Sequence, residues 1–207
     1  MEILLATNNA KKRVELERML APLGVTVLVP SDVGGIEDVD EDRPTFAGNA
    51  EKKAVSAARA KGKWCLADDS GLEVDFLDGA PGVFSARFAG EPCDDQKNND
   101  LLLEKLNNVA EDQRGAQFVC ALCLVRPDGS IAGEITGTAR GRILEAPRGD
   151  GDFGYDPLFL FTEEGFAQTG RGFAELSPAE KSEVSHRGRA LRALVEHLET
   201  HLPEFAS

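Results

Sequence analysis

Two adjacent carboxylates, Asp68 and Asp69, follow an apolar segment in the stretch LADDSGLEVD and precede Ser70. Like charges placed side by side repel, and burying them costs roughly several kcal/mol unless a cation lies between them. Carboxylates combined with substrate phosphates are the ligand set that Mg²⁺ prefers. The pair therefore predicts a Mg²⁺ site with Asp68 and Asp69 as ligands, in which one carboxylate is available to orient or deprotonate water. A purely structural pair is the alternative.

A second candidate is the polar loop TNNAKK, which joins the first expected strand to the first expected helix. At such a position, backbone N–H groups and the positive end of the helix dipole point at a bound anion, usually a phosphate. The loop lacks the G-x-x-x-x-G-K pattern of a Walker A sequence, so an ordinary strand-to-helix connection is the alternative. The residues concerned are Thr7, Asn8, Asn9, Ala10, Lys11 and Lys12.

Three further segments combine charges or rings in ways that suit ligand binding. The acidic run 37–42 offers oxygen ligands, although a solvated face is the alternative. The stretch FGYDP, starting at Phe153, sets an aromatic ring beside a carboxylate, where the alternative is a simple turn with a core phenylalanine. The stretch SHR, residues 185–187, follows Lys181 and is compatible with a basic patch at a helix end.

Hydrophobic periodicity predicts the elements that position these residues. Apolar strands are expected at 2–6, 25–29 and 64–67, the third of which ends at the aspartates. An Ala-rich helix runs from the N-cap Thr45 to about Lys61. The residues expected on one face of the first helix are Leu16, Met19, Leu20 and Leu23. Strands alternating with helices predict an α/β fold with functional loops at strand ends.

The second half changes character. QFVCALCLVR, the turn PDGS and IAGEITGTARGRI predict a long antiparallel hairpin, which forms a second lobe over roughly 115–150. One helix starts near Asp94, and the segment 177–180 has the capping-box spacing that begins another. The core face of the last helix is expected to carry Leu191, Leu194, Val195 and Leu198. Without repeats or linkers, the chain is expected to form a single domain, 1–207, with one cleft between two lobes.

The charge balance limits the partners. The 207 residues include 23 basic and 36 acidic side chains, a net charge of −13, which is the opposite of a nucleic-acid-binding footprint. Neither a basic apolar leader nor an apolar run near about 18 residues is present, so we expect no export and no membrane span.

The cysteines and histidines give weaker signals. Cys120 and Cys123 have the spacing of half a zinc site, but positions three apart in an extended strand point to opposite faces. Buried, reduced thiols are expected instead, which fits a cytoplasmic protein. His197 and His201 have metal-compatible spacing, yet their acidic neighbours favour a solvated helix face.

Taken in order along the chain, these segments resemble the inosine triphosphate pyrophosphatase family, the non-standard purine nucleoside triphosphate pyrophosphatases (XTP/dITP diphosphatases). The matching segments are LATNNAKKRVEL, TFAGNAEKKA, ADDSGLEVD, GAPGVFSARFAG, DQKNN, FGYDPLF and ELSPAEKSEVSHRGRAL. Each is weak alone, but together they cover nearly the whole chain in order, which makes chance a poor explanation.

The resemblance implies an elongated α/β fold with a long twisted mixed β-sheet flanked by helices, an active-site cleft between two lobes, and a homodimer. It also implies hydrolysis of ITP, dITP and XTP between the α and β phosphorus atoms, which gives a monophosphate and pyrophosphate, with Mg²⁺ as cofactor. Such a reaction cleanses the nucleotide pool and prevents incorporation of these bases into DNA and RNA.

Residue roles follow from the same resemblance. Asp69 is implied as the general base and a metal ligand, Ser70 touches the substrate, and the loop 7–12 holds the triphosphate with Lys12 on the phosphates. The residues implied to line the base pocket are Phe153, Gly154, Tyr155, Asp156, Lys181, His186 and Arg187.

Two positions depart from the family pattern. Asn8 stands where the family often has glycine, and Gly48 stands where it usually has glutamate. If that glutamate helps to hold the metal, its duty passes to the acidic loop, with Glu41 the best match and Asp40 next. Asp69 is untouched by either departure.

Base selection follows from hydrogen-bond polarity. Hypoxanthine presents a carbonyl acceptor at position 6, where adenine presents an amino donor, so donors such as Arg187, Lys181 and His186 favour the former. Two other interpretations stay open. One is a Maf-like nucleotide pyrophosphatase with another base preference, against which FGYDP and SHRGRAL argue. The other is a non-catalytic nucleotide-binding module, which Gly48 makes conceivable and which release of pyrophosphate would exclude.

Overall fold

A computed structural model describes residues 1–151 and 153–202, apart from the side chains of Ala10 and Lys11. The chain forms two compact units. Unit 1 comprises Met1–Asp69, Cys120–Gly137 and Ala190–Ser207, and unit 2 comprises Ser70–Val119 and Thr138–Arg189. Each unit therefore consists of segments that are distant in the sequence.

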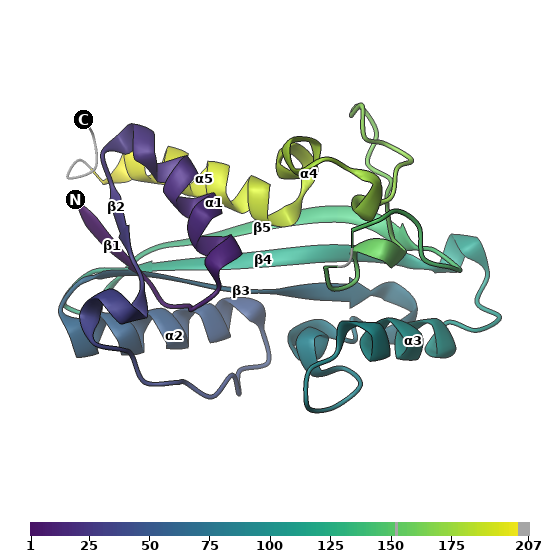
Figure 1. Cartoon of the computed structure of the whole chain (residues 1–207), viewed down its shortest axis with the longest axis horizontal. Coiled ribbons are helices and arrows are strands. Elements are labelled where there is room, and N and C mark those ends of the chain that lie inside the picture. The colour runs from purple at the N-terminus through teal and green to yellow at the C-terminus, as the bar shows by residue number, and fades with distance from the viewer. Residues whose placement is uncertain (152, 203–207) are drawn as a thin grey trace. The chain divides into compact units, whose positions relative to one another are not determined.

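The strands form one mixed sheet with the order β2-β1-β3-β4-β5-β6 (Figure 1). Their bounds are β1 Glu2–Leu5, β2 Thr26–Leu28, β3 Trp64–Val74, β4 Gly115–Val125, β5 Ile131–Ile143 and β6 Phe159–Phe161. β1 pairs in parallel with β2 and β3, whereas β5 pairs antiparallel with β6. β3, β4 and β5 contribute residues to both units. The expected mixed α/β sheet is thus confirmed.

Helices flank the sheet, as expected. The α-helices are α1 Ala10–Leu20, α2 Phe46–Lys61, α3 Asp95–Lys105, α4 Pro178–Val184 and α5 His186–His201. Shorter 3₁₀ helices are η1 Ala21–Leu23, η2 Pro30–Val33, η3 Asp75–Leu77, η4 Gly82–Arg87, η5 Glu111–Gln113, η6 Asp156–Leu158 and η7 Phe173–Glu175. The predicted N-caps are confirmed: the Thr45 side chain accepts from the Gly48 N–H, and Ser177 and Glu180 form a capping box at α4.

In unit 1 the sheet is covered on both faces, because alternate strand residues point in opposite directions. Ile3 and Leu5 pack with α1 and α5, whereas Leu4 packs with the alanines of α2. Figure 1 shows this arrangement, with α2 on one face and α1 and α5 on the other. The predicted core face of α1, built on Leu16 and Leu20, is confirmed.

The two cysteines of the CALC stretch, Cys120 and Cys123, confirm the expected alternation. Cys120 belongs to the cluster beneath α1 and α5, and Cys123 belongs to the cluster beneath α2. Burial raises the pKa of Cys65 and Cys123 to about 12, so both thiols stay protonated at neutral pH. They are structural side chains.

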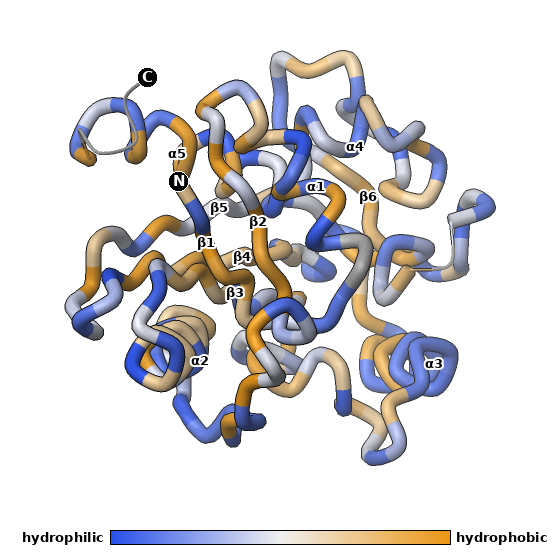
Figure 2. The backbone as a smooth tube through the Cα atoms, turned by 60° about the vertical axis from the view of Figure 1, so that its left-hand side comes forward, coloured by the Kyte–Doolittle hydropathy of each residue, from blue (hydrophilic) through white to orange (hydrophobic). Residues whose placement is uncertain are grey.

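Unit 2 has its own core, which is rich in aromatic rings. The Phe118 ring lies 4.7 Å from that of Phe159 and 5.7 Å from that of Phe173, measured between centroids. Leu102 of α3 and Leu106, the residue just after it, pack into the same cluster, which leaves the polar face of α3 to solvent (Figure 2).

β3 differs from its expected bounds. It continues from Trp64 through both aspartates to Val74, so the prediction that it ends before Asp68 was wrong. A strand accepts consecutive charged residues when each has a partner on its own face of the sheet, and both carboxylates have one, as described below.

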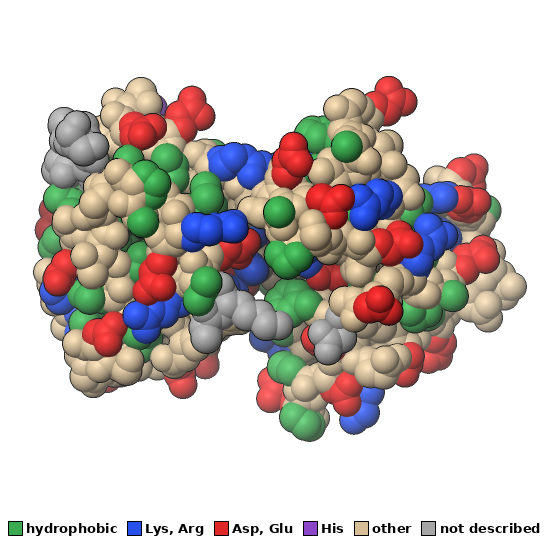
Figure 3. Space-filling model, turned by 45° about the horizontal axis from the view of Figure 1, so that its top comes forward, with side chains coloured by type: hydrophobic (Ala, Val, Ile, Leu, Met, Phe, Trp, Pro, Cys, Tyr) green, Lys and Arg blue, Asp and Glu red, His purple; other side chains and the backbone are tan. Residues whose placement is uncertain are grey.

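Acidic and basic side chains are interspersed on the face seen in Figure 3, in keeping with many local ion pairs. Among the described residues, no helix combines the length and apolarity that crossing a membrane requires.

Candidate active site

The loop before α1 is fixed by its own side chains. The Thr7 hydroxyl oxygen accepts a hydrogen bond of 3.3 Å from the Asn9 N–H, and Asn9 Oδ1 accepts one of 3.2 Å from the Lys12 N–H. Asn9 therefore acts as the N-cap of α1 and satisfies one of the N–H groups that a helix start exposes. Asn8 is exposed, and the side chains of Ala10 and Lys11 lie outside the described part of the chain.

Lys12 pairs with the first aspartate of β3. Its Nζ lies 2.7 Å from Asp68 Oδ2, and the Asp68 side chain is only 5% exposed. The Lys12 side chain is 20% exposed, so its ammonium group faces both the buried carboxylate and solvent. Asp68 thus holds in place the Lys12 ammonium group, which is expected from the sequence to bind the phosphates.

Asp69 has different partners, which lie on α2. Its Oδ2 accepts a 3.0 Å hydrogen bond from Asn49 Nδ2, and its Oδ1 lies 3.9 Å from Lys53 Nζ. Asn49 is buried, and its own Oδ1 accepts from the Arg43 N–H at 3.0 Å, which fixes the orientation of the amide. The carboxylate of Asp69 is therefore positioned by a side chain that cannot rotate without losing two hydrogen bonds.

The adjacent aspartates do not share a cation. Asp68 contacts α1 and Asp69 contacts α2, helices that cover opposite faces of the sheet in unit 1. The repulsion expected from their adjacency is reduced because strand alternation turns the two side chains apart. The structure therefore accommodates two adjacent carboxylates by giving each its own basic or amide partner on a different face of the sheet.

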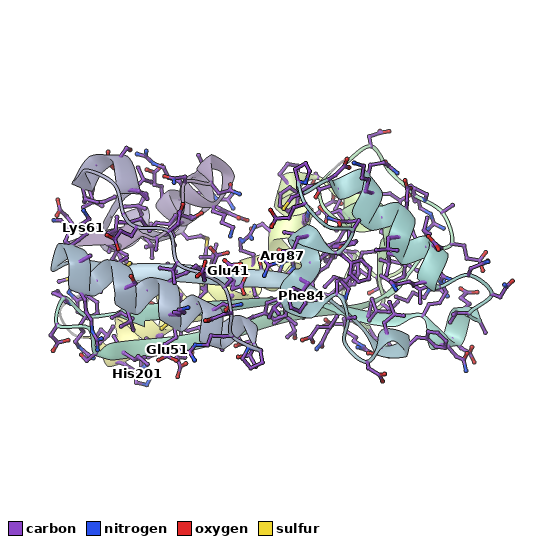
Figure 4. All side chains as sticks on the ribbon, turned by 90° about the horizontal axis from the view of Figure 1, so that it is seen from below. Glu41, Glu51, Lys61, Phe84, Arg87 and His201 are labelled. Carbon is purple, nitrogen blue, oxygen red and sulfur yellow. The ribbon has the colours of Figure 1, made fainter. Side chains whose placement is uncertain are left out.

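The acidic loop lies against α2 through two consecutive lysines. Lys53 Nζ is 2.7 Å from Glu41 Oε1, and Lys52 Nζ donates to the Asp40 backbone oxygen and to Asp42 Oδ1, both at 2.9 Å. The Lys53 ammonium group consequently lies near the carboxylates of both Glu41 and Asp69 (Glu41 is labelled in Figure 4). Asp40 contributes its backbone oxygen to this network.

This donor set suits a hard divalent cation. Two carboxylates, Glu41 and Asp69, flank one position where a positive charge already lies. Within the described residues, no group of three or more His, Cys, Asp or Glu side chains is arranged to hold a metal. Mg²⁺ fits such a sparse site, because it binds through one or two carboxylates and completes its shell with water and substrate phosphates.

In unit 2, Lys181 lies among rings and a carboxylate. Its Nζ contacts Asp156 Oδ2 and lies 5.7 Å from the ring centroids of Phe153 and Phe173. Burial raises the pKa of Asp156, and the neighbouring Lys181 opposes that rise. Phe153 is 46% exposed, and its ring lies beside the Lys181 ammonium group.

His186 and Arg187 begin α5, where a tight junction with α4 sets their direction. The Ser185 hydroxyl oxygen accepts from the Gly188 N–H at 3.1 Å and so caps the helix. A Cβ on Gly188 would lie 1.9 Å from the backbone oxygen of Ser182, so only glycine fits. The His186 ring stacks on that of Phe118 at 4.8 Å, and Arg187 donates to the Ser70 hydroxyl oxygen at 3.2 Å.

Tyr155 faces inward. Its side chain is 5% exposed, and its hydroxyl donates to the Ser85 backbone oxygen at 2.8 Å. Burial raises the pKa of this hydroxyl well above its usual value. The ring thus anchors the FGYD segment to the 3₁₀ helix η4, whose Phe84 and Arg87 are labelled in Figure 4 and form a cation–π contact of 5.2 Å.

The structure brings the predicted residues together in two groups, one in each unit. In unit 1 it joins Lys12 to Asp68 and brings Glu41 close to the Lys53 that also faces Asp69. In unit 2 the group comprises Ser70, Phe153, Asp156, Lys181, His186 and Arg187.

Asn49, Lys53 and Phe118 were not singled out by sequence reasoning. A signal existed for the first two, because an amide and a lysine interrupt the alanine face of α2 at positions 49 and 53.

The fold and these two groups define a class of α/β protein. Its members have a capped polar loop before the first helix, a positioned carboxylate on a central strand, and a helix junction with basic and aromatic side chains. The chain belongs to the Ham1 family, whose model matches residues 3–197. It is 49% identical over 198 residues to a dITP/XTP pyrophosphatase of Desulforamulus reducens, covering 96% of each chain. A Ham1 protein of Staphylococcus aureus has a similar structure, with a TM-score of 0.87, 38% identity, and coverage of 96% of this chain and 98% of that one. A nucleoside-triphosphatase / dITP/XTP pyrophosphatase of Mycobacterium abscessus has a TM-score of 0.79 and 45% identity, over 94% of this chain and 98% of that one.

Proposed function

We propose that this chain is a nucleoside triphosphate pyrophosphatase that hydrolyses dITP, XTP and ITP to the monophosphate and pyrophosphate. The observation that carries the proposal is the Asp69 carboxylate, held by Asn49 on a central strand near a cation-binding position. Membership of the Ham1 family and the names of its relatives support the reaction class. Removal of these triphosphates keeps non-standard bases out of DNA and RNA.

Unit 1 supplies the groups for the phosphates. Lys12 contributes a positive charge, and the N–H groups at the start of α1 suit phosphate oxygens. Glu41 and Asp69 would hold a divalent cation, with Asp40 as the next predicted ligand, whereas Asp68 points to the opposite face of the sheet, toward Lys12. Bound there, Mg²⁺ would neutralise charge on the triphosphate and lower the cost of the charge that develops in the reaction.

Asp69 serves as the general base. It accepts a proton from water as the water oxygen bonds to the α phosphorus, and the bond from that phosphorus to the α–β bridging oxygen breaks. The electron pair leaves with pyrophosphate, and the monophosphate retains the new oxygen. The hydrogen bond from Asn49 keeps the Asp69 carboxylate in one orientation, which is the role a positioned base requires.

Unit 2 supplies the groups for the base. Arg187, Lys181 and His186 carry N–H donors that suit the 6-carbonyl of hypoxanthine or xanthine, and the exposed ring of Phe153 suits stacking. Adenine presents a donor at the same position, so its binding would leave these groups unpaired. Ser70, Gly154, Tyr155 and Asp156 complete the predicted set, with Tyr155 acting from within the core.

The protein is also proposed to work as a homodimer in the cytoplasm. The dimer rests on the family resemblance, and the cytoplasmic location rests on the buried, protonated thiols, which suit a reducing compartment.

The test is a panel of triphosphates with pyrophosphate release as the readout. dITP, XTP and ITP are compared with ATP, GTP, dTTP and UTP, with and without Mg²⁺. Fast Mg²⁺-dependent release from the first three supports the proposal. Preference for dTTP or UTP would indicate a Maf-like specificity, and binding without release would indicate a nucleotide-binding module.

A further inference from the structure

Two side chains of α3 hold the backbone N–H and C=O of one residue in the FGYD segment, Gly154, and so fix the two peptide units on either side of it. The Gly154 N–H donates to Asp95 Oδ2 at 2.9 Å, and Asn99 Nδ2 donates to the Gly154 oxygen at 2.8 Å. Asp95 and Asn99 lie four residues apart, which places them one above the other on the same helix face. Gly154 has a φ of +55°, a left-handed conformation that leaves both of its polar groups accessible to α3.

The two residues that follow Gly154 in the FGYD segment are anchored as well. Tyr155 is bonded to the Ser85 oxygen, and Asp156 contacts Lys181. Burial raises the pKa of Asp156, and the charge of Asp95 adds to that rise, which indicates that Asp95 acts on the segment electrostatically as well. Phe153, by contrast, is exposed and has its ring next to Lys181. Gly154 is therefore the joint between an exposed ring and two anchored side chains.

We propose that Asp95 and Asn99 are positioning residues that fix the backbone of Gly154 on both sides of its Cα and thereby set the placement of Phe153 for the nucleobase. The proposal rests on the function proposed above. Neither residue needs to touch the substrate, since each acts through Gly154. Without the two hydrogen bonds a glycine would rotate readily, and the bound conformation of the loop would be populated only part of the time.

The neighbouring amide provides a matched control. Asn98 is also buried on α3, but its Oδ1 accepts from the Ala89 N–H and its Nδ2 donates to the Ala86 oxygen. Both of these partners lie before α3 in the chain, so the Asn98 amide acts on residues 86–89, whereas the Asn99 amide acts on Gly154. Asn98→Asp and Asn99→Asp each replace an amide NH₂ donor on α3 by a carboxylate oxygen. The first change affects the segment at Ala86, and the second affects the FGYD segment.

Asp95 has a matched control as well. Asp100 lies on the same helix, is exposed, and accepts from the Gln96 side chain at 2.8 Å. Asp95→Ala removes the acceptor of the Gly154 N–H, Asp95→Asn restores an acceptor oxygen, and Asp100→Ala removes the same carboxylate from a position that does not contact the segment.

The experiment measures three quantities on each purified full-length variant: the KM and kcat for dITP, the Kd for IMP by calorimetry, and amide exchange at Gly154 by NMR. Loss of either hydrogen bond is expected to raise the KM and the Kd about three- to tenfold with kcat within about twofold, the size of one hydrogen bond. Exchange at Gly154 should accelerate in Asp95→Ala and Asn99→Asp. Asp95→Asn should recover most of the affinity, and Asp100→Ala should match the wild type.

The outcomes separate this inference from the proposed function. If the wild type hydrolyses dITP while Asp95→Ala and Asn99→Asp leave KM and Kd unchanged, the inference alone is overturned. Equal losses in Asn98→Asp and Asn99→Asp would also overturn it, because a general loss of stability would then explain both. If the wild type binds IMP without hydrolysing dITP, the proposed reaction fails and the IMP affinities decide the inference. A chain that does neither overturns both.

Discussion

Asn49 Nδ2 lies 3.0 Å from Asp69 Oδ2, so an amide on α2 orients a carboxylate on β3. The two residues are twenty positions apart, and the contact forms only because α2 covers the face of the sheet to which Asp69 points. A base positioned in this way loses little entropy when water and substrate bind, which is the advantage of a preorganised site.

Asp69→Asn is expected to retain the fold and nearly abolish turnover. The substitution preserves the shape of the side chain but removes the proton acceptor and one charge of the cation site. General-base catalysis contributes roughly 10²–10⁴-fold, so the rate should fall at least about a hundredfold. Pyrophosphate release and thermal unfolding of the same sample measure both effects. A variant that keeps more than about a tenth of the wild-type rate would show that Asp69 is not the base.

Glu41→Gln is expected to raise the Mg²⁺ concentration needed for half-maximal rate. Glu41 and Asp69 both lie near the Lys53 ammonium group, and the amide that replaces Glu41 would bind a cation more weakly than a carboxylate does. Asp38→Asn, an exposed change in the same loop, serves as the control. An unchanged magnesium titration for Glu41→Gln would move the second ligand to Asp40.

Lys12→Met is expected to destabilise the protein by about 2 kcal/mol, since it removes the cation beside the buried Asp68 carboxylate. The partial exposure of Lys12 places this value below that of a fully buried pair. In the double variant Lys12→Met/Asp68→Asn the unpaired charge is gone, so at least half of the loss should return. Urea unfolding of the wild type, Lys12→Met and the double variant measures these differences in the free energy of unfolding. A double variant less stable than Lys12→Met would contradict the pairing.

The sequence specified much of this arrangement through local patterns. The Thr45 cap, the capping box at Ser177 and the face of α1 follow from neighbours within four residues, and all are present. The extent of β3 could not be predicted in the same way. Asp68 and Asp69 resemble a strand end until their partners on α1 and α2 are known, and those partners come from distant positions.

The contacts of the aromatic side chains could not be predicted from the sequence either. Phe118 reads as one more apolar residue of a buried strand, yet its ring supports His186. Which aromatic ring lies beneath which functional side chain depends on the pairing of strands and helices, for which periodicity carries no information. The identities of Lys181, His186 and Arg187 were visible in the sequence, whereas the contacts that orient them were not.

Gly188→Ala is expected to destabilise the protein by about 2 kcal/mol or more, because the new Cβ would overlap the Ser182 oxygen at the α4–α5 junction. Turnover should fall further than stability alone explains, since His186 and Arg187 begin the displaced helix. Gly48→Ala is the matched control. Its Cβ would lie 3.0 Å from the Arg43 Cβ and 3.2 Å from the Thr45 hydroxyl oxygen, contacts that a shift of a few tenths of an ångström relieves, and alanine favours the helix, so the loss of stability should be smaller than for Gly188→Ala. Equal melting temperatures for Gly188→Ala and the wild type would contradict the tight junction.

Arg187→Ala separates a base-binding residue from a structural one. Arg187 donates to the Ser70 hydroxyl oxygen at 3.2 Å, a bond that orients the guanidinium group in unit 2. If it also donates to the 6-carbonyl of the base, it forms a charged hydrogen bond worth roughly 1.5–3 kcal/mol, and its loss should lower kcat/KM for ITP about ten- to a hundredfold. ATP offers no carbonyl there, so its kcat/KM should change much less and the ITP/ATP ratio must fall. Arg192→Ala, an exposed change on the same helix, should leave the ratio unchanged. Were Arg187 purely structural, both substrates would lose activity equally, because a displaced Ser70 and a loosened α5 do not distinguish a carbonyl from an amino group.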